Sequence, residues 1–84
     1  MCDFEKCAAD VKNLKSRPSD DELLSLYGLY KQATVGDVTG DAPGLLDVKG
    51  KAKFNAWTSR KGMSQDDAKA QYCALAKELM AKHN

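Results

Sequence analysis

The stretch Tyr27–Asp37 reads YGLYKQATVGD and decides how the whole chain is interpreted. We expect it to form the C-terminal half of a helix. Tyr27, Tyr30 and Lys31 then share one face, because residues three and four positions apart are neighbours on a helix surface. Two aromatic rings beside an ammonium group can stack on a flat base and neutralise a phosphate. The pattern therefore favours a ligand-facing surface over a face that only packs in a core.

The helix that contains this stretch has clear ends in the sequence. Ser19 and Glu22 form a capping-box pattern, and Gly36 suits a left-handed cap, so a helix is predicted from about Ser19 to Val35. Gly28 inside it costs about 1 kcal/mol relative to alanine. This glycine would serve either the close approach of another group or tight helix packing, and both interpretations stay open at this point.

A shorter helix is predicted before it, from Asp3 as N-cap to about Lys15. Its apolar residues recur at spacings of four, three and three, which is a helical stripe: Phe4, Ala8, Val11 and Leu14. Pro18 ends the segment, since the residue before a proline avoids helical geometry. The connection to the next helix is therefore short.

Two more helices are expected after the glycine-rich loop between Gly36 and Leu46. Asp47 is a candidate cap for a helix over residues 49–60 that closes at Gly62. Ser64 and Asp67 mark the start of the last helix. Its apolar stripe is Ala68, Tyr72, Leu75, Ala76 and Leu79.

Four helices joined by short, long and short connections predict an all-α fold. The long loop lets the third helix run parallel to the second, because eleven loop residues can span a helix of about 23 Å. We therefore predict a four-helix up-down-down-up bundle with a bowl between the first, second and third helices. With 84 residues, the chain is expected to form one domain over residues 1–84.

Composition narrows the classes of partner. A net charge of +1 predicts no general affinity for nucleic acid or for anionic membranes. The longest apolar run, Tyr72–Ala76, is too short to cross a bilayer, so no stable membrane insertion is expected. Phe4 is followed at once by Glu5 and Lys6, which does not suit a secretory leader.

The cysteines and the single histidine give little support to a metal site or an enzyme. Cys2, Cys7 and Cys73 fit neither a disulfide scaffold nor a zinc pattern, so reduced thiols in a cytoplasmic protein are expected. His83 lies one residue from the end of the chain, where fraying is common. We therefore expect no metal, no cofactor and no catalytic residues.

The stretch Tyr27–Asp37 is followed by Pro43-Gly44 and by DVKGKAKFNAW at residues 47–57. Together these motifs resemble the acyl-CoA-binding protein family, and the resemblance is collinear from Phe4 to about Ala81. It implies the same four-helix fold. It also implies a monomeric cytoplasmic carrier that binds long-chain acyl-CoA with high affinity and breaks no bond.

The resemblance also implies roles for particular residues. Tyr30, Lys31 and Lys53 match the positions that hold the adenine and the 3′-phosphate. Further head-group positions are matched by Lys12, Tyr27 and Tyr72, with Gly28 and Leu29 in the same contact stretch. Ala8, Leu23 and Leu24 match the groove for the acyl chain. Periodicity alone favours solvated lysines and core tyrosines at these positions.

One residue departs from the family pattern, and one alternative function stays open. Phe54 stands where the family commonly has tryptophan, which keeps an apolar contact but loses area and the indole N–H. The alternative to a carrier is a helical signalling module or, as the resemblance to some relatives implies, the precursor of a receptor-modulating peptide from about Gln32 to Lys51.

Overall fold

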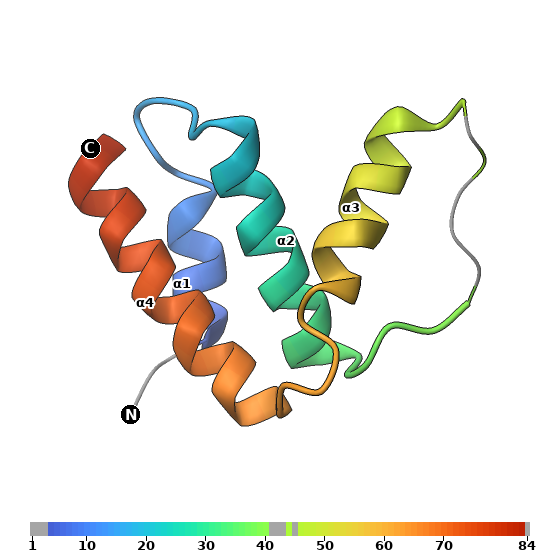
Figure 1. Ribbon diagram of the computed structural model, residues 1–84. Coiled ribbons are helices and arrows are strands. Elements are labelled where there is room, and N and C mark those ends of the chain that lie inside the picture. The colour runs from blue at the N-terminus through green and yellow to red at the C-terminus, as the bar shows by residue number, and fades with distance from the viewer. Residues whose placement is uncertain (1–3, 41–43, 45, 84) are drawn as a thin grey trace.

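The computed structural model describes residues 4–40, 44 and 46–83. Within these ranges all regular structure is helical (Figure 1). The helices are α1 (Phe4–Val11), α2 (Asp20–Thr34), α3 (Val48–Thr58) and α4 (Gln65–His83). The prediction of an all-α fold is confirmed.

The helices follow an up-down-down-up course. In Figure 1, α1 and α4 run in one direction, while α2 and α3 run side by side in the other. α4 packs against both α1 and α2, and α3 packs against α2. The predicted parallel arrangement of the second and third helices is therefore confirmed.

The predicted capping of α2 is present at both ends. The backbone N–H of Glu22 donates to Ser19 Oγ at 3.2 Å, and the backbone N–H of Ser19 donates to Glu22 Oε1 at 2.8 Å. Gly36 has a φ of +100°, the left-handed geometry that favours glycine after a helix. The residues that flank the Tyr27–Asp37 stretch thus fix where its helix begins and ends.

α1 is shorter than predicted. It ends at Val11, and the backbone N–H groups of Lys12 and Asn13 donate to the carbonyls of Ala9 and Asp10 in tighter, three-residue turns. The proposed cap, Asp3, lies outside the described residues. The apolar stripe nevertheless packs as expected, with Phe4, Ala8, Val11 and Leu14 against the core.

The starts of α3 and α4 agree with the sequence to within a residue or two. Asp47 Oδ1 accepts the backbone N–H of Gly50 at 2.9 Å, and Ser64 Oγ accepts that of Asp67 at 3.1 Å. Gly62 has a φ of +92° in the connection between the two helices. Side-chain caps therefore satisfy backbone donors at both helix starts.

The core lies where α4 meets α1 and α2. Its buried cluster consists of Cys7 from α1, Leu26 and Leu29 from α2, and Tyr72, Cys73, Ala76 and Leu79 from α4. The stripe predicted for the last helix is therefore largely buried. α4 is the element on which α1 and α2 are both held.

Gly28 marks the place where α2 and α3 cross. A Cβ atom added to Gly28 would lie 2.5 Å from the carbonyl oxygen of Ala56, closer than real Cβ atoms come to such an atom. Tight helix packing, one of the two interpretations left open by the sequence, therefore explains this glycine. Nearby, the indole N–H of buried Trp57 donates to the carbonyl of Gly36 at 2.8 Å.

The C-terminal end of α4 is tied to the start of α2. His83 Nε2 and Lys82 Nζ each lie 3.2 Å from a carboxylate oxygen of Glu22. Ser16 Oγ lies 2.9 Å from His83 Nδ1, and the backbone N–H of Ser16 donates to the carbonyl of His83. The single histidine therefore has structural partners at the top of the bundle.

Two further findings bear on the predictions from composition. No helix in the described part of the chain is long and apolar enough to cross a membrane. Cys73, buried in α4, is disulfide-bonded, so the expectation of reduced thiols is wrong for this residue. Cys2 lies outside the described residues.

Candidate functional site

A trough lies between α1 and α2. Both helices pack on α4, yet in the described ranges they do not approach each other closely along their backbones. Two adjoining depressions occupy the space between them, one of about 500 Å³ and one of about 480 Å³. Side chains from α4 reach the trough as its floor, as Tyr72 does in the first depression.

The first depression is mostly apolar and is called the inner pocket below. It is lined by Ala8, Val11, Lys12, Leu23, Leu26, Tyr27, Tyr30 and Tyr72. Most of these side chains are aliphatic or aromatic, and Lys12 supplies a cation. An elongated apolar ligand with an anionic end suits such a surface.

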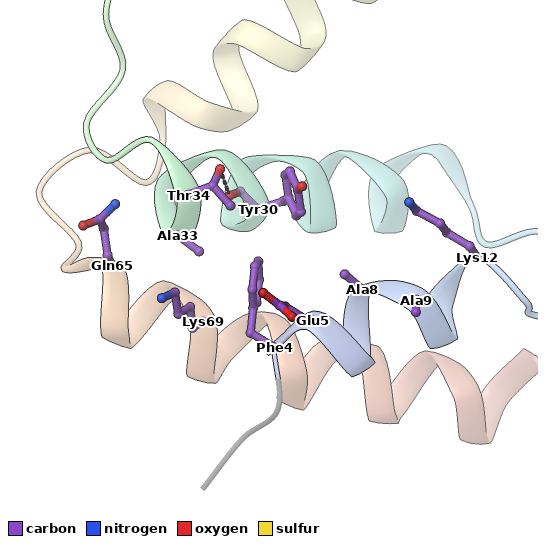
Figure 2. A pocket seen from close by; sticks show the side chains of 10 residues that line it. All are labelled: Phe4, Glu5, Ala8, Ala9, Lys12, Tyr30, Ala33, Thr34, Gln65 and Lys69. Carbon is purple, nitrogen blue, oxygen red and sulfur yellow. Dashed lines mark hydrogen bonds between the residues drawn. The ribbon is translucent and has the colours of Figure 1, made fainter.

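The second depression continues from the first and is called the outer pocket below. Figure 2 shows its lining side chains, which come from α1 and Lys12 directly after it, from α2 and from the start of α4. They are Phe4, Glu5, Ala8, Ala9, Lys12, Tyr30, Ala33, Thr34, Gln65 and Lys69. The two pockets share Ala8, Lys12 and Tyr30, so Tyr30 stands at their junction.

Three aromatic rings support this junction. The Phe4 and Tyr30 rings stack with centroids 5.7 Å apart, and Phe4 meets Tyr72 edge-on at 5.0 Å. Tyr72 is 4% exposed, and this burial raises the pKa of its hydroxyl. Tyr30 is 41% exposed. Phe4 and Tyr72 thus back the Tyr30 ring on one side and leave part of it available for stacking.

Two lysines lie along the seam between α2 and α3. Lys53 Nζ is 5.5 Å from the centroid of the Tyr27 ring, and Lys31 Nζ is 5.0 Å from that of Trp57. Residues 27 and 31 are one turn apart, as are residues 53 and 57, so the pairs form two adjacent layers between parallel helices. Both ammonium groups are close enough for cation–π attraction.

The structure brings most of the predicted site residues together. Six of them line the inner pocket: Ala8, Lys12, Leu23, Tyr27, Tyr30 and Tyr72. Lys53 adjoins this pocket through its contact with Tyr27. Lys31 lies toward α3, over Trp57, rather than in the trough.

Besides Lys31 and Lys53, three further predicted residues do not line either pocket. Gly28 is buried against the backbone of α3, and Leu29 belongs to the core cluster. Leu24 is half-buried in α2 beside Leu23. Contact of these three with a ligand stays a prediction, and the packing of Gly28 and Leu29 gives each a structural role.

The position of the bowl differs from the sequence-based expectation. Its lining comes from α1, α2 and α4, whereas the bowl was expected between the first three helices. The physical reason is that, among the described helices, α3 packs on α2 alone, and none of its residues is among those that line the two pockets. The third helix contributes through the seam, where Lys53 stands over Tyr27.

Sequence reasoning did not identify several lining residues as part of a site. Val11 and Leu26 line the inner pocket, while Phe4 and Lys69 line the outer one. Phe4 and Val11 were recognised only as part of the apolar stripe of α1. The available signal was the spacing of Phe4, Ala8 and Val11 on one face, which pattern reasoning assigns to a core.

In the described ranges, no group of three or more histidine, cysteine, aspartate or glutamate residues is placed to hold a metal ion. The lining of the two pockets combines apolar, aromatic and cationic side chains with Glu5, Thr34 and Gln65.

Comparison with protein families decides the identity of this arrangement. The family model described as "Acyl CoA binding protein" matches residues 1–76. The chain belongs to the acyl-CoA-binding protein family. The resemblance recognised in the motifs is thereby confirmed, and membership supports the binding of acyl-CoA.

Relatives within the acyl-CoA-binding protein family agree over nearly the full chain. The chain is 58% identical over 80 residues to Acyl-CoA-binding protein homolog 1 of Caenorhabditis elegans, covering 95% of this chain and 93% of that protein. The crystal structure of Oryza sativa Acyl-CoA-Binding Protein 2 superposes with a TM-score of 0.90 at 42% identity, covering 94% of this chain and 86% of the other.

A solution structure supports the same assignment. That of the yeast Acyl Coenzyme A Binding Protein is 50% identical and superposes with a TM-score of 0.76, covering 95% of this chain and 93% of the other. These identities are high enough for the similarity to extend beyond the fold. The four-helix arrangement of this chain is therefore that of other acyl-CoA-binding proteins.

Proposed function

We propose that this chain is a single-domain, monomeric carrier that binds long-chain acyl-CoA thioesters with high affinity in the cytoplasm and breaks no bond in them. One observation carries the proposal: an apolar pocket opens beside an exposed tyrosine ring and lysine ammonium groups in a member of this family. The acyl chain, the adenine and the phosphates of such a ligand bind best to an apolar surface, a flat aromatic face and cations, respectively.

The acyl chain is assigned to the inner pocket. Ala8 and Leu23 line it, and Leu24 follows Leu23 on α2. Burial of each methylene is worth about 0.8 kcal/mol, so a chain of roughly 16 carbons could contribute on the order of 10 kcal/mol. A tail that is partly hidden in micelles or membranes before binding gains less than this. The tail therefore supplies most of the affinity in this proposal.

The coenzyme A head group is assigned to the junction and the seam. Tyr30 would stack on the adenine, and Lys31 and Lys53 would contact the 3′-phosphate. Both ammonium groups lie over aromatic rings. A phosphate would draw them away, because a charge-assisted hydrogen bond is worth about 1.5–3 kcal/mol.

Other head-group residues act beside these. Lys12 and Tyr27 line the inner pocket and can contact the pantetheine or phosphate portions. Tyr72 supports the aromatic cluster from its floor. Gly28 and Leu29 hold the ligand-facing side of α2 in place through their packing.

Calorimetric titration with palmitoyl-CoA, free coenzyme A and palmitate tests the proposal. A carrier that uses tail and head together binds palmitoyl-CoA far more tightly than either fragment. Equal affinity for palmitate and palmitoyl-CoA would contradict a role for the head-group residues. Release of free thiol during incubation would contradict a carrier that leaves the thioester intact.

Two lysine variants test the residue assignment. Lys31→Ala and Lys53→Ala should each weaken binding of palmitoyl-CoA, while helicity measured by circular dichroism stays unchanged. Lys77→Ala, on the exposed side of α4, is the matched control and should bind as the unmodified chain does. Loss of helicity in the first two variants would show that these residues are structural.

The state of Cys73 tests the proposed location. Disulfides are rare in cytoplasmic proteins, because the thiol pool keeps cysteines reduced. Alkylation of the protein taken directly from cells, followed by mass spectrometry, tests whether the disulfide bond of Cys73 is present there, and a thiol at Cys73 would support the cytoplasm. A quantitative disulfide at Cys73 would point to an oxidising compartment.

A further inference from the structure

The outer pocket lies on the head-group side of the site. Along α2, Leu23 and Leu26 line the inner pocket, Tyr30 lies at the junction, and Ala33 and Thr34 line the outer pocket. Leu23 and Thr34 are separated by about 16 Å along the helix axis. Because the proposed function places the acyl chain near Leu23 and the adenine near Tyr30, the outer pocket continues beyond the adenine.

The chemistry of the outer pocket differs from that of the inner one. Phe4, Ala8 and Ala33 give it an apolar floor, and Figure 2 shows the Phe4 and Tyr30 rings near its middle. Five further lining residues carry polar or charged groups: Glu5, Lys12, Thr34, Gln65 and Lys69. An apolar floor with a polar rim suits part of a nucleotide better than the end of an alkyl chain.

The cations of the outer pocket stand at its two ends. In Figure 2, Lys12 and Lys69 lie on opposite sides of the Phe4–Tyr30 pair. Among the described lining residues there are two ammonium groups and one carboxylate, that of Glu5, so their summed charge is positive. Lys12 also lines the inner pocket, whereas Lys69 is found only in the outer one.

We propose that the outer pocket extends the head-group site and that Lys69 of α4 is a further contact to a phosphate of the ligand. This inference rests on the proposed binding of acyl-CoA. The head group carries a pyrophosphate and a separate 3′-phosphate, so it can use cations on two sides of α2. Lys31 and Lys53 provide one set at the seam with α3, and Lys69 provides a cation on the side of α4.

The test compares Lys69→Met with Lys77→Met, a matched change on the same helix outside both pockets. The methionine keeps much of the apolar stem and removes the charge. Lys69→Met should weaken binding of palmitoyl-CoA about fivefold, as expected for an exposed ion pair. Lys77→Met should bind as the unmodified chain does. Equal affinities of the two variants would overturn the proposal.

Two shortened ligands identify the phosphate. Palmitoyl-dephospho-CoA lacks the 3′-phosphate. If Lys69→Met still weakens the binding of this ligand, Lys69 contacts the pyrophosphate. If Lys69→Met no longer weakens its binding, Lys69 contacts the 3′-phosphate. Palmitoyl-pantetheine carries no phosphate, so Lys69→Met should not alter its binding. If Lys69→Met weakened the binding of palmitoyl-pantetheine as much as that of palmitoyl-CoA, Lys69 would act on something other than phosphate, and the proposal would be overturned.

Glu5→Gln gives an independent test, in which the affinity for palmitoyl-CoA should rise and not fall. Removing the carboxylate of Glu5, which lines the outer pocket, should strengthen binding of palmitoyl-CoA by a few-fold at low salt and less at high salt. Unchanged or weaker binding at low salt would contradict an anionic ligand in this pocket. Failure of the unmodified chain to bind palmitoyl-CoA is a separate outcome, which would remove the proposed function itself.

Discussion

Lys53 Nζ of α3 lies 5.5 Å from the centre of the Tyr27 ring of α2. One turn further along the two helices the order is reversed, and Lys31 of α2 lies over Trp57 of α3. Each helix therefore offers a cation to a ring of the other. These two contacts place both proposed phosphate-binding lysines at the seam between α2 and α3.

Trp57 should report ligand binding through Lys31. Trp57 is the only tryptophan of the chain, and an ammonium group lies 5.0 Å from its ring. If a phosphate draws Lys31 away, the emission of Trp57 changes as palmitoyl-CoA is added. Lys31→Met should lose most of this change, while Lys77→Met retains it. The same change in both variants would show that the tryptophan responds to something other than Lys31.

Gly28→Ala should destabilise the fold. Alanine gains about 1 kcal/mol in a helix interior relative to glycine. The new methyl group would, however, lie 2.5 Å from the carbonyl oxygen of Ala56, which belongs to the backbone of α3. Overpacking of this kind typically costs about 1–3 kcal/mol, so a net loss of stability is expected in urea denaturation.

Gly44→Ala is the control for that experiment. A methyl group at Gly44 meets nothing within 4 Å, and this residue lies outside the helices. The free energy of unfolding of Gly44→Ala should stay within about 0.5 kcal/mol of that of the unmodified chain. A stabilised Gly28→Ala variant would show that α3 can move away from α2 without loss, which the close packing at this crossing argues against.

Leu23→Ala should weaken binding in proportion to the length of the acyl chain. Leu23 lines the inner pocket, which is assigned to the tail. Removing its side chain reduces apolar contact, so titration with an acyl-CoA series should show a larger loss for palmitoyl-CoA than for octanoyl-CoA. Leu46→Ala, at a side chain that is 98% exposed and outside the trough, should bind both as before. A loss that does not depend on chain length would place the tail elsewhere.

Acid should destabilise the fold through Glu22. Hydrogen bonds from the backbone N–H of Ser19, and then from Lys82 and His83, lower the pKa of this carboxyl from 4.5 to about 2. A carboxyl with a depressed pKa stabilises the fold above the unfolded-state pKa, and that contribution is lost as pH falls from about 4.5 toward 2. Thermal unfolding of Glu22→Gln should show a smaller fall in Tm over this range than the unmodified chain.

A second carboxyl must be considered in that measurement. The backbone N–H of Gly62 and the side chain of Gln32 lower the pKa of Asp37, so it also loses its contribution in acid. Some acid dependence should therefore remain in Glu22→Gln and decrease further when Asp37→Asn is added. Identical acid profiles for Glu22→Gln and the unmodified chain would contradict the role given to Glu22.

Most of the fold could be predicted from local signals. The capping box of Ser19 and Glu22, the positive-φ glycines and the helical stripes each act over one or two turns, and the structure confirms them. The long loop correctly indicated that α2 and α3 run parallel. The early end of α1 at Val11 was not predicted, because the apolar spacing continues through Leu14 beyond the last helical residue.

The site was harder to predict because it depends on which helices touch. Sequence spacing gives the faces of a helix but not its neighbours, so the trough was placed beside the third helix instead of over α4. The sequence does not distinguish Lys53 from the other lysines of α3, whereas its contact with Tyr27 in the structure does. Lys69 carried no signal at all, since only the tertiary structure brings it near Tyr30.

The most direct test is to locate a bound palmitoyl-CoA by intermolecular nuclear Overhauser effects. The terminal methyl group of the tail should contact Leu23 or Leu26 in the inner pocket, and the adenine H8 should contact the Tyr30 ring. Contacts of the tail with exposed Leu46, or of the adenine with residues remote from Tyr30, would contradict the assignment of the trough between α1 and α2 as the acyl-CoA site.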